Sequence, residues 1–422
     1  MANAKVVILG GGFGGLNAAK SLGNTRFDVI LIDKTNHHLF QPLLYQVATA
    51  ALSPGDIAVP IREILSPYPN ITVFMGDVLT IDKESAHVTL HTGEKIGYDY
   101  LIVALGARHS YFGNEGWEEF APGLKTLNDA LKIREQILIS FEKAERCDSI
   151  SEAKKYLNFV IIGGGPTGVE MAGAIAEIAY KTMLKDFRRI DTTQSKIYLI
   201  EASPQILPVY PEKLSLKAKG YLEHFGVHVI TGRRVSQVTK EGVQVENTFI
   251  PTENIFWAAG NQASPVLKTM NVPLDRQGRV QVDADLSLPD HPELFVIGDT
   301  ACALDKKGKP FPALAPVAVQ EGRYVAKIIR EEIPKSQRSP FSYLDKGTMA
   351  TIGETKAVGM FGKLQFSGFI AWLAWSFIHV LYLIGFRNRI TVAIQWLFSY
   401  FSSKKGARLI YRHLDDDPHK KP

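Results

Sequence analysis

The chain has 422 residues, of which 45% are hydrophobic and 22% are charged, and its formal net charge is +5. This length predicts two or three domains, and the composition excludes a disordered chain. A mild positive charge without a dense basic run interleaved with aromatic residues argues against nucleic-acid binding. The two cysteines, Cys147 and Cys302, lie far apart and in no metal-binding spacing, so we expect inert thiols in a reducing compartment and no metal site.

The first predicted element is a strand over residues 4–9, with no signal-peptide pattern before it, so we expect the start of the chain to stay in the cytoplasm. A loop with G-x-G-x-x-G spacing and a helical pattern follow, with glycines at Gly10, Gly12 and Gly15. Such glycines allow a tight turn, close approach of the backbone to a pyrophosphate and close helix packing, and the helix N-terminus attracts phosphates. Asp33 ends the next strand roughly 20 residues on, where an acid accepts hydrogen bonds from a ribose. This order of elements predicts a dinucleotide site.

The same order of elements recurs in the middle of the chain, after a strand over residues 159–162. The second glycine loop has the same spacing, with Gly163, Gly165 and Gly168. The strand that follows its helix ends in Glu201, and an acid there favours NAD because it repels a 2′-phosphate. Arg233 and Arg234 lie later in the chain and could offset this preference.

Two dinucleotide sites in one chain predict a flavoprotein that accepts a hydride from a nicotinamide nucleotide. The alternative is a duplicated fold with one inactive site, which we disfavour because both copies keep three glycines and the terminal acid. Three later strands, within DYLIVALGA, NIFWAAGN and LFVIGDTA, end in further glycines or a Gly-Asp pair. The residues concerned are Gly106, Gly260, Gly298 and Asp299.

Together, and in this order, these segments resemble the two-dinucleotide flavoprotein reductase superfamily over most of residues 4–335. The resemblance implies an α/β fold with two Rossmann-type domains, in which Gly106, Gly298 and Asp299 serve FAD and Gly260 serves NADH. It also implies that the NADH-binding domain is inserted into the FAD-binding domain. The expected ranges are 1–123 and 261–335 for the FAD-binding domain, 124–260 for the NADH-binding domain and 336–422 for a C-terminal membrane-anchoring domain.

Many members of this superfamily pass electrons to a cysteine pair in the stretch that corresponds to HHLFQPLLYQVATAALSP. This stretch contains no cysteine here, which excludes a disulfide reductase. It closely resembles the matching segment of type II NADH dehydrogenases, the single-chain NADH:quinone oxidoreductases. The resemblance implies that Pro42, Tyr45 and Gln46 form a wall near the isoalloxazine, whereas the alternative is a loop leading into a core helix. A sulfide:quinone oxidoreductase stays the alternative function, although Cys147 and Cys302 fit its paired reactive cysteines poorly.

Two further segments strengthen this resemblance. In GGGPTGVEMAG, the family places Glu170 near the flavin and the quinone path, and LAPVAVQEG resembles the quinone-site motif AQxAxQ. Gln320 matches the last position of that motif, whereas Pro316 replaces its first glutamine. Lys346 matches a lysine that the family places close to Glu170, and Met349 would line the quinone tunnel. The alternatives are a solvated Glu170, ionised with the help of the helix dipole, a surface or capping amide at Gln320 and a surface lysine.

The composition changes near the C-terminus. The segment 368–386 is almost uncharged and is long enough to span a bilayer, and the segment after it has an apolar face. Its basic flanks, typical of an interfacial helix on anionic lipid, are Arg387, Arg389, Lys404, Lys405 and Arg408. The alternative is a buried helix pair at a dimer interface. The resemblance favours an amphipathic membrane anchor that lies on the membrane, and the tail DDDPHKKP is predicted to be disordered.

These observations predict a peripheral membrane enzyme with FAD and NADH. It would transfer a hydride from NADH to FAD and two electrons to a membrane quinone at the cytoplasmic face of the cell inner membrane, with Glu170, Gln320 and Lys346 as catalytic residues. We expect no proton pumping, because no bundle of spans with buried charges is present. A homodimer stays open, as does a redox-responsive membrane adaptor with negligible turnover. The sequence leaves open which quinone is used.

Overall fold

The computed structural model describes residues 3–402 and 405–410, so the DDDPHKKP tail lies outside the described residues. Contacts divide the chain into two compact units, each assembled from three segments. Unit 1 comprises Met1–Leu39, Ala58–Arg108 and Asn261–Lys346, and unit 2 comprises Phe40–Ile57, His109–Gly260 and Gly347–Pro422. This division follows contacts and not cofactors, so the four domain ranges given above stay a prediction.

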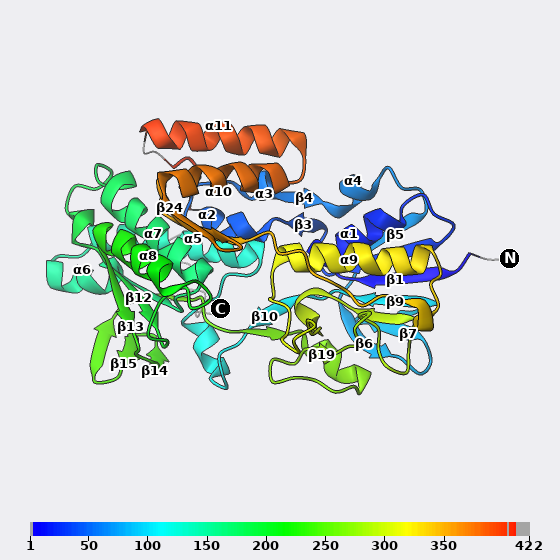
Figure 1. Cartoon of the computed structure of the whole chain (residues 1–422). Helices are drawn as coiled ribbons and strands as arrows, with labels where there is room; N and C mark the ends of the chain where they lie inside the picture. Colours follow the sequence, from blue (N-terminus) through cyan, green and yellow to red (C-terminus); the bar gives the residue numbers. More distant parts are fainter. Residues whose placement is uncertain (1–2, 403–404, 411–422) are drawn as a thin grey trace. The chain divides into compact units, whose positions relative to one another are not determined.

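A five-stranded parallel sheet forms the centre of unit 1, with strand order β20-β9-β1-β2-β5 (Figure 1). Its strands are β1 (Lys5–Leu9), β2 (Asp28–Asp33), β5 (Ile71–Met75), β9 (Tyr100–Val103) and β20 (Leu294–Val296). Continuous apolar runs suit such strands, because both faces of a parallel sheet are covered. Helices α1 (Phe13–Leu22) and α9 (Ala315–Arg330) pack closely, since a Cβ on Gly322 would lie 2.3 Å from the Gly14 carbonyl oxygen.

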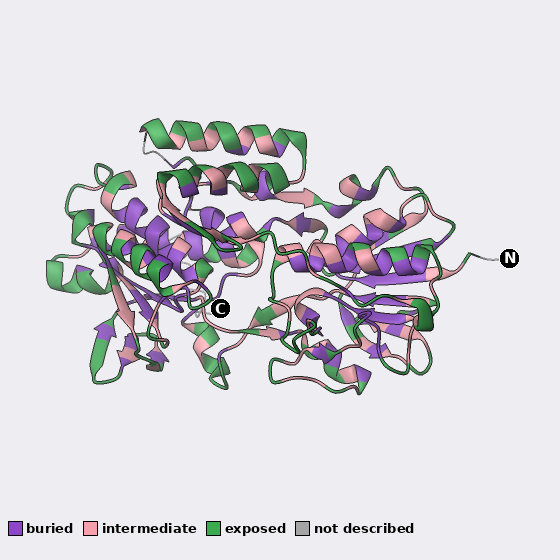
Figure 2. Ribbon diagram, in the orientation of Figure 1, coloured by how far each residue is buried: buried purple, intermediate pink, exposed green. Residues whose placement is uncertain are grey.

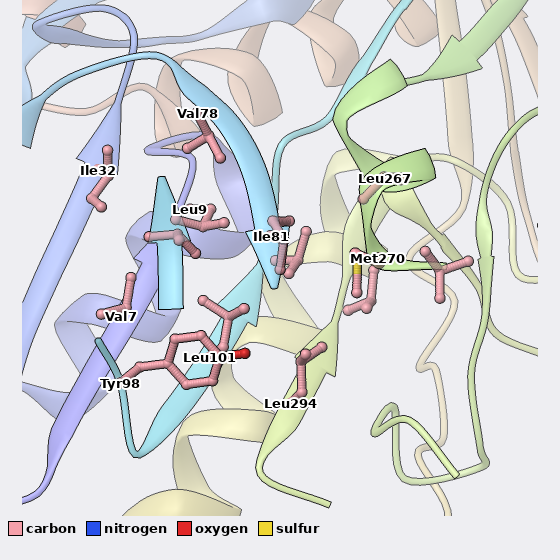
Figure 3. Packing of buried hydrophobic residues seen from close by; sticks show 14 of the residues in the cluster. Val7, Leu9, Ile32, Val78, Ile81, Tyr98, Leu101, Leu267, Met270 and Leu294 are labelled. Atoms are coloured by element: carbon pink, nitrogen blue, oxygen red, sulfur yellow. The ribbon is translucent and has the colours of Figure 1, made fainter. Parts of the chain in front are cut away.

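The remaining elements of unit 1 extend its core. The antiparallel sheet of β6 (Val78–Asp82), β7 (His87–Leu90) and β8 (Lys95–Gly97) joins the parallel sheet and η5 (Pro265–Met270) in one buried apolar cluster, part of which is drawn in Figure 3. The shorter elements are β3 (His37–Leu39), β4 (Ala58–Pro60), α4 (Ile61–Leu65), β18 (Asn261–Ala263), β19 (Val280–Gln281), η6 (Gly298–Thr300), β21 (Ala301–Cys302) and η7 (Lys335–Gln337). Strand β10 (Ala107–His109) carries the chain into unit 2.

A four-stranded parallel sheet with order β13-β12-β11-β17 forms the centre of unit 2. Its strands are β11 (Asn158–Ile162), β12 (Lys196–Glu201), β13 (Val227–Thr231) and β17 (Asn254–Trp257). Helix α7 (Pro166–Glu177) follows the second glycine loop, and α5 (Leu127–Glu145) begins with a capping box between Thr126 and Asp129. Each unit therefore holds a parallel sheet built around a strand, a glycine loop and a helix, which confirms the α/β prediction.

Smaller elements complete this part of unit 2. They are η1 (Gln41–Leu43), α2 (Leu44–Ala48), α3 (Pro54–Ile57), η2 (Glu115–Glu119), α6 (Ile150–Leu157), η3 (Ile178–Thr182), η4 (Thr192–Gln194), α8 (Glu212–His224), β14 (Val235–Thr239), β15 (Gly242–Val245) and β16 (Thr248–Pro251). The last three strands form an antiparallel sheet.

The C-terminal part of unit 2 is an antiparallel sheet followed by two helices. The sheet contains β22 (Thr348–Ile352), β23 (Lys356–Phe361) and β24 (Leu364–Gly368), and the helices are α10 (Phe369–Tyr382) and α11 (Phe386–Ser402). Helix α7 approaches the turn after β22, since a Cβ on Gly173 would lie 2.9 Å from the Gly353 amide nitrogen. Among the described residues, no helix is both long and apolar enough to cross a membrane.

Candidate functional site

The first glycine loop leaves β1 and enters α1 in unit 1. Gly10 has a φ of +102°, and a Cβ there would lie 2.3 Å from the Ala104 carbonyl oxygen. A Cβ on Gly15 would lie 1.9 Å from the Gly10 carbonyl oxygen, so the helix can begin here only with glycine. A Cβ on Gly12 would meet nothing within 4 Å, and α1 has no side-chain cap. The loop thus leaves open space beside uncapped helix N–H groups, which fits a diphosphate.

Asp33 holds this loop from the end of β2. Its Oδ2 accepts a hydrogen bond of 2.6 Å from the Gly11 amide, and its Oδ1 accepts bonds of 2.7 Å from the amide and the hydroxyl of Thr35. A carboxylate oxygen offers two lone pairs, so Asp33 retains acceptor capacity for ribose hydroxyls. The residues that the sequence assigned to the FAD nucleotide therefore fit it.

The second glycine loop repeats this geometry in unit 2. Gly163 has a φ of +113°, and a Cβ on Gly168 would lie 1.9 Å from the Gly163 carbonyl oxygen. Gly165 opens onto free space, and α7 lacks a side-chain cap. Glu201 takes the place of Asp33, because its Oε2 accepts a bond of 2.6 Å from the Gly164 amide and its Oε1 one of 2.7 Å from the Ser203 amide. The second loop therefore fits a dinucleotide as well as the first.

Of the two arginines that could offset the preference for NAD, Arg233 already has a partner. Arg233 forms an ion pair with Glu246 at an exposed position, and its backbone amide bonds to the Glu201 carbonyl oxygen at 3.3 Å. The Arg233 guanidinium is therefore already engaged by a carboxylate.

The other predicted nucleotide residues lie in both units. Gly106 and Gly298 belong to unit 1 with φ values of +68° and +67°, and a Cβ on Gly106 would meet nothing within 4 Å. Gly260 has a φ of +71° and belongs to unit 2. Pro42 and Gln46, predicted to face the flavin, also belong to unit 2, whereas Asp299 follows Gly298 in η6.

Glu321 is a site residue that the sequence reasoning missed. Its Oε2 accepts a hydrogen bond of 2.5 Å from the Gly298 amide, and its side chain is buried. Burial raises the pKa of Glu321 to about 7, and the Gly298 bond opposes this rise. Glu321 therefore holds the turn at Gly298 and Asp299 in place. The sequence feature that could have revealed it is an acid on the apolar face of α9, next to Gln320.

The predicted quinone residues are divided between the units. Pro316, Gln320 and Lys346 belong to unit 1, and Glu170 and Met349 belong to unit 2. Pro316 stands in the first turn of α9, where its missing N–H costs no hydrogen bond. The Gln320 amide donates to the Leu344 carbonyl at 3.0 Å and accepts from the Leu344 amide at 2.9 Å. Gln320 thus clamps the segment that leads to Lys346.

Glu170 lies on α7 and faces a cavity of about 60 Å³ in unit 2, which we name the α7 cavity. Its walls come from α2, α7, the turn after β22, α10, α11 and the segment at Lys405. Burial raises the pKa of Glu170 to about 8, and a bond from the Thr351 amide opposes this rise. This direction runs against the alternative of a solvated, ionised Glu170, because loss of hydration disfavours the charged carboxyl.

A hydrogen-bonded chain links α11 to Tyr45 in the wall of this cavity. The Trp396 indole donates to Gln46 Oε1 at 2.7 Å, and Gln46 Nε2 donates to the Tyr45 hydroxyl at 2.8 Å. Burial, with the nearby Glu170 carboxyl as a second cause, raises the pKa of Tyr45 well above its usual value. Tyr45 therefore stays a neutral phenol, oriented from α11.

A second carboxylate, Glu177, lies in the same cavity and was also missed. Its Oε2 lies 3.6 Å from Lys405 Nζ, and both side chains are buried. Its Oε1 accepts a 2.5 Å bond from the Glu354 amide, while Glu354 Oε1 accepts a 2.9 Å bond from Ser399. Burial raises the pKa of Glu177 to about 7, although Lys405 opposes this. The signal was its position seven residues after Glu170, on the same face of α7.

Lys405 and Arg408 do not form the predicted basic flank for lipid headgroups. Lys405 is buried against Glu177 and donates to the Ala174 carbonyl at 3.3 Å. Arg408 forms an ion pair with Asp186. Lys404 lies outside the described residues, whereas Arg387 is exposed at the start of α11. The prediction is therefore wrong for Lys405, whose charge pairs with the buried Glu177, and for Arg408, whose charge pairs with the exposed Asp186.

Two parallel sheets, each with a glycine loop and an acid at the end of the next strand, define a flavoprotein with two dinucleotide sites. Residues 4–322 match the family described as pyridine nucleotide-disulphide oxidoreductase, and residues 346–405 match the NDH2 C-terminal domain. The chain is 44% identical over 420 residues to the type II NADH:quinone oxidoreductase Ndh of Mycobacterium tuberculosis, covering 95% of this chain and 89% of that protein. The chain belongs to the type II NADH:quinone oxidoreductase family.

Solved structures show the same fold. NDH2 from Plasmodium falciparum in complex with NADH is similar with a TM-score of 0.88 at 21% identity, covering 97% of this chain and 100% of that chain. The sulfide:quinone oxidoreductase from Aquifex aeolicus is similar with a TM-score of 0.73 at 21% identity, covering 92% of each chain. The fold alone therefore accommodates both functions weighed from the sequence.

Proposed function

We propose that the protein is a non-proton-pumping NADH:quinone oxidoreductase, in which FAD accepts a hydride from NADH and passes two electrons to a membrane quinone. The observation that carries this proposal is the 44% identity over 95% of the chain to a type II NADH:quinone oxidoreductase. The two nucleotide loops support it, because each combines open space, uncapped helix N–H groups and an acid. When bound, FAD supplies the redox chemistry, and the protein supplies position and electrostatics.

The residues of unit 1 would hold FAD. Gly10, Gly12 and Gly15 leave room for its diphosphate at the N-terminus of α1, and Asp33 accepts from its ribose. Gly106, Gly298 and Asp299 complete the proposed site. Glu321 keeps the Gly298 turn in place through its bond to the Gly298 amide.

The residues of unit 2 would hold NADH. Gly163, Gly165 and Gly168 would receive its diphosphate and Glu201 its ribose, with Gly260 at the end of β17. A 2′-phosphate beside Glu201 would place two negative charges together, so NADH is favoured over NADPH.

For the quinone we propose the residues that the family resemblance indicated. Pro316, Gln320 and Met349 would line its site, while Glu170, Gln320 and Lys346 would act on it, with Pro42 and Gln46 toward the flavin. The raised pKa of Glu170, about 8, means that the carboxyl holds a proton at neutral pH. A protonated acid can donate to a quinone that has accepted electrons.

The outer faces of α10 and α11 support a peripheral membrane location. Ile370 and Phe377 lie on one face of α10 and are 75% and 69% exposed, and Phe386 and Phe401 on α11 are 77% and 78% exposed. Figure 2 shows how exposed residues follow both helices. Large exposed apolar residues beside the basic Arg387 fit the interface of an anionic bilayer. We propose that these helices lie on the cytoplasmic face of the inner membrane. The alternative to test is that their apolar faces form the interface of a homodimer.

The sulfide:quinone alternative finds little support in the thiols. Cys147 and Cys302 are both free, and burial raises the pKa of each. Reactive cysteines have lowered pKa values, because the thiolate is the nucleophile. The two residues therefore have the character of inert thiols.

Anaerobic flavin absorbance of the detergent-solubilised protein tests the proposal. NADH should bleach the flavin, and a short-chain quinone should restore its absorbance. Bleaching by sulfide but not by NADH would instead establish the sulfide:quinone function. Tight NADH binding without bleaching would favour the non-enzymatic adaptor.

A further inference from the structure

The α7 cavity contains polar atoms without partners. Trp375 Nε1, Ser376 Oγ and Gln395 Oε1 are buried without a hydrogen-bond partner among the described residues, and all three residues line this cavity. Trp375 is only 1% exposed. Buried polar groups are normally satisfied by protein or by ordered water, so these three atoms offer hydrogen bonds to water in the cavity.

The size of the cavity is sufficient for several water molecules. Its volume is about 60 Å³, whereas an apolar cavity that binds benzene measures about 150 Å³. A water molecule needs a cavity of roughly 10–15 Å³ and two to four polar partners. The cavity therefore has room for a few water molecules.

Helix α7 places two carboxyls along this cavity. Glu170 and Glu177 are seven residues apart, which at a rise of 1.5 Å per residue separates them by about 10 Å along the helix. Ala174 lies between them on the same face and also lines the cavity, so no bulky side chain blocks the interval. Two or three water molecules joined by hydrogen bonds of about 2.8 Å bridge such a distance.

The end of the α7 cavity at Glu177 includes a residue that is partly exposed. Glu177 accepts from the Glu354 amide and faces Lys405, and Glu354, in the turn after β22, is only partly buried. The charged and titratable groups around Glu177 are thus Lys405, Glu354 and, more weakly, Lys181, with Glu170 and Tyr45 farther along the cavity. Glu177 itself is buried, so a proton from solvent would reach it past the partly buried Glu354.

We propose that the α7 cavity holds a chain of ordered water molecules that delivers a solvent proton from Glu177 to Glu170. This inference rests on the proposed function. Reduction of a quinone by NADH consumes one proton from solvent, since NADH + H⁺ + quinone gives NAD⁺ + quinol. Glu170 gives its proton to the reduced quinone oxygen, the water chain reprotonates Glu170, and Glu177 replaces that proton from solvent. The pKa values of about 8 and about 7 allow both carboxyls to exchange protons near neutral pH.

Anaerobic stopped-flow absorbance of the full-length protein tests the relay, because it separates flavin reduction by NADH from reoxidation by a short-chain quinone. Glu177→Gln keeps the shape of the side chain but cannot pass a proton as an acid. Because this change leaves the Lys405 charge unpaired, a second variant, Glu177→Gln with Lys405→Met, removes both charges. Glu223→Gln on the exposed face of α8 is the matched control.

We expect both Glu177 variants to slow reoxidation about tenfold or more, within the range of lost acid–base catalysis. Flavin reduction should stay close to wild type, and the solvent deuterium isotope effect on reoxidation should grow. Reoxidation at the wild-type rate in the double variant overturns the relay and leaves Glu177 and Lys405 a structural pair. Equal slowing of both half-reactions also overturns it. If quinone fails to reoxidise the wild-type flavin, the proposed function itself fails.

Discussion

The helices α1 and α7 follow glycine loops of the same geometry, but different elements pack against them. In α1, the position that matches Glu170 is Asn17, which donates to the Phe13 carbonyl and accepts from Arg323 of α9. In α7, Glu170 instead faces a polar cavity beneath the C-terminal elements. The loop chemistry is therefore conserved within the chain because a diphosphate requires it, whereas the outer face of each helix depends on what packs over it.

The largest expected effects come from breaking the shared design in each copy. Gly15→Ala and Gly168→Ala each place a Cβ 1.9 Å from a carbonyl oxygen, and overpacking of this kind costs about 1–3 kcal/mol. We expect Gly15→Ala to lower FAD content and Gly168→Ala to retain FAD but raise the KM for NADH, each about tenfold or more. Flavin absorbance and steady-state kinetics measure the two effects.

Gly220→Ala on α8 is the control for both substitutions, because its Cβ would meet nothing within 4 Å. Loss of FAD from the Gly168→Ala protein would show that the two loops do not serve separate nucleotides.

The second prediction tests the position at which the two helices differ. Glu170→Gln should slow quinone-dependent reoxidation about tenfold to 100-fold while flavin reduction stays near wild type. Asn17→Ala, at the matching position of α1, should change neither rate comparably. Stopped-flow absorbance gives both rates, and equal effects of the two variants would contradict a special role for Glu170.

Glu170 also makes a signed prediction for stability. Its pKa rises from 4.5 in the unfolded chain to about 8 in the folded protein. Between these values the folded state binds the extra proton, so the free energy of unfolding should decline as pH rises from about 4.5 to about 8 and level off above. Chemical denaturation across this range should show a shallower decline in Glu170→Gln. An identical slope in both proteins would contradict the raised pKa.

The next effect concerns α10 and α11, the C-terminal helices. Phe377→Ser and Phe401→Ser should each weaken binding to anionic vesicles, because burying a phenylalanine in the interface contributes about 1.5–3 kcal/mol. Phe361→Ser on β23, 59% exposed in the wild type, is the control and should bind normally. Vesicle co-sedimentation measures the binding. Unchanged binding together with a loss of dimers would assign these helices to a homodimer.

The smallest effect comes from the hydrogen bond between Trp396 of α11 and Gln46 in the wall of the α7 cavity. Trp396→Phe removes the donor to Gln46 and should lower the free energy of unfolding by about 1–2 kcal/mol. Trp372→Phe, in the same cavity wall but stacked between Phe369 and Tyr400, should cost less. Denaturant titration compares them. A larger loss for Trp372→Phe would show that ring packing, and not the Gln46 bond, stabilises this wall.

The sequence by itself determined the two nucleotide loops and their acids. Glycine spacing, strand ends and helix starts are local features, and steric contacts such as that between Gly15 and the Gly10 carbonyl act over a few residues. The α/β fold and the C-terminal helices could be predicted for the same reason, because their hydrophobic patterns are continuous in the sequence.

Only the tertiary structure decided the electrostatic state of the buried groups. Glu170, Glu177 and Glu321 look like ordinary helix carboxylates in the sequence, and burial by distant segments raises their pKa values. Lys405 looks like a headgroup ligand until its pairing with Glu177, more than two hundred residues earlier in the chain, is known. Hydration is lost only when elements far apart in the sequence pack together, and no local pattern contains that information.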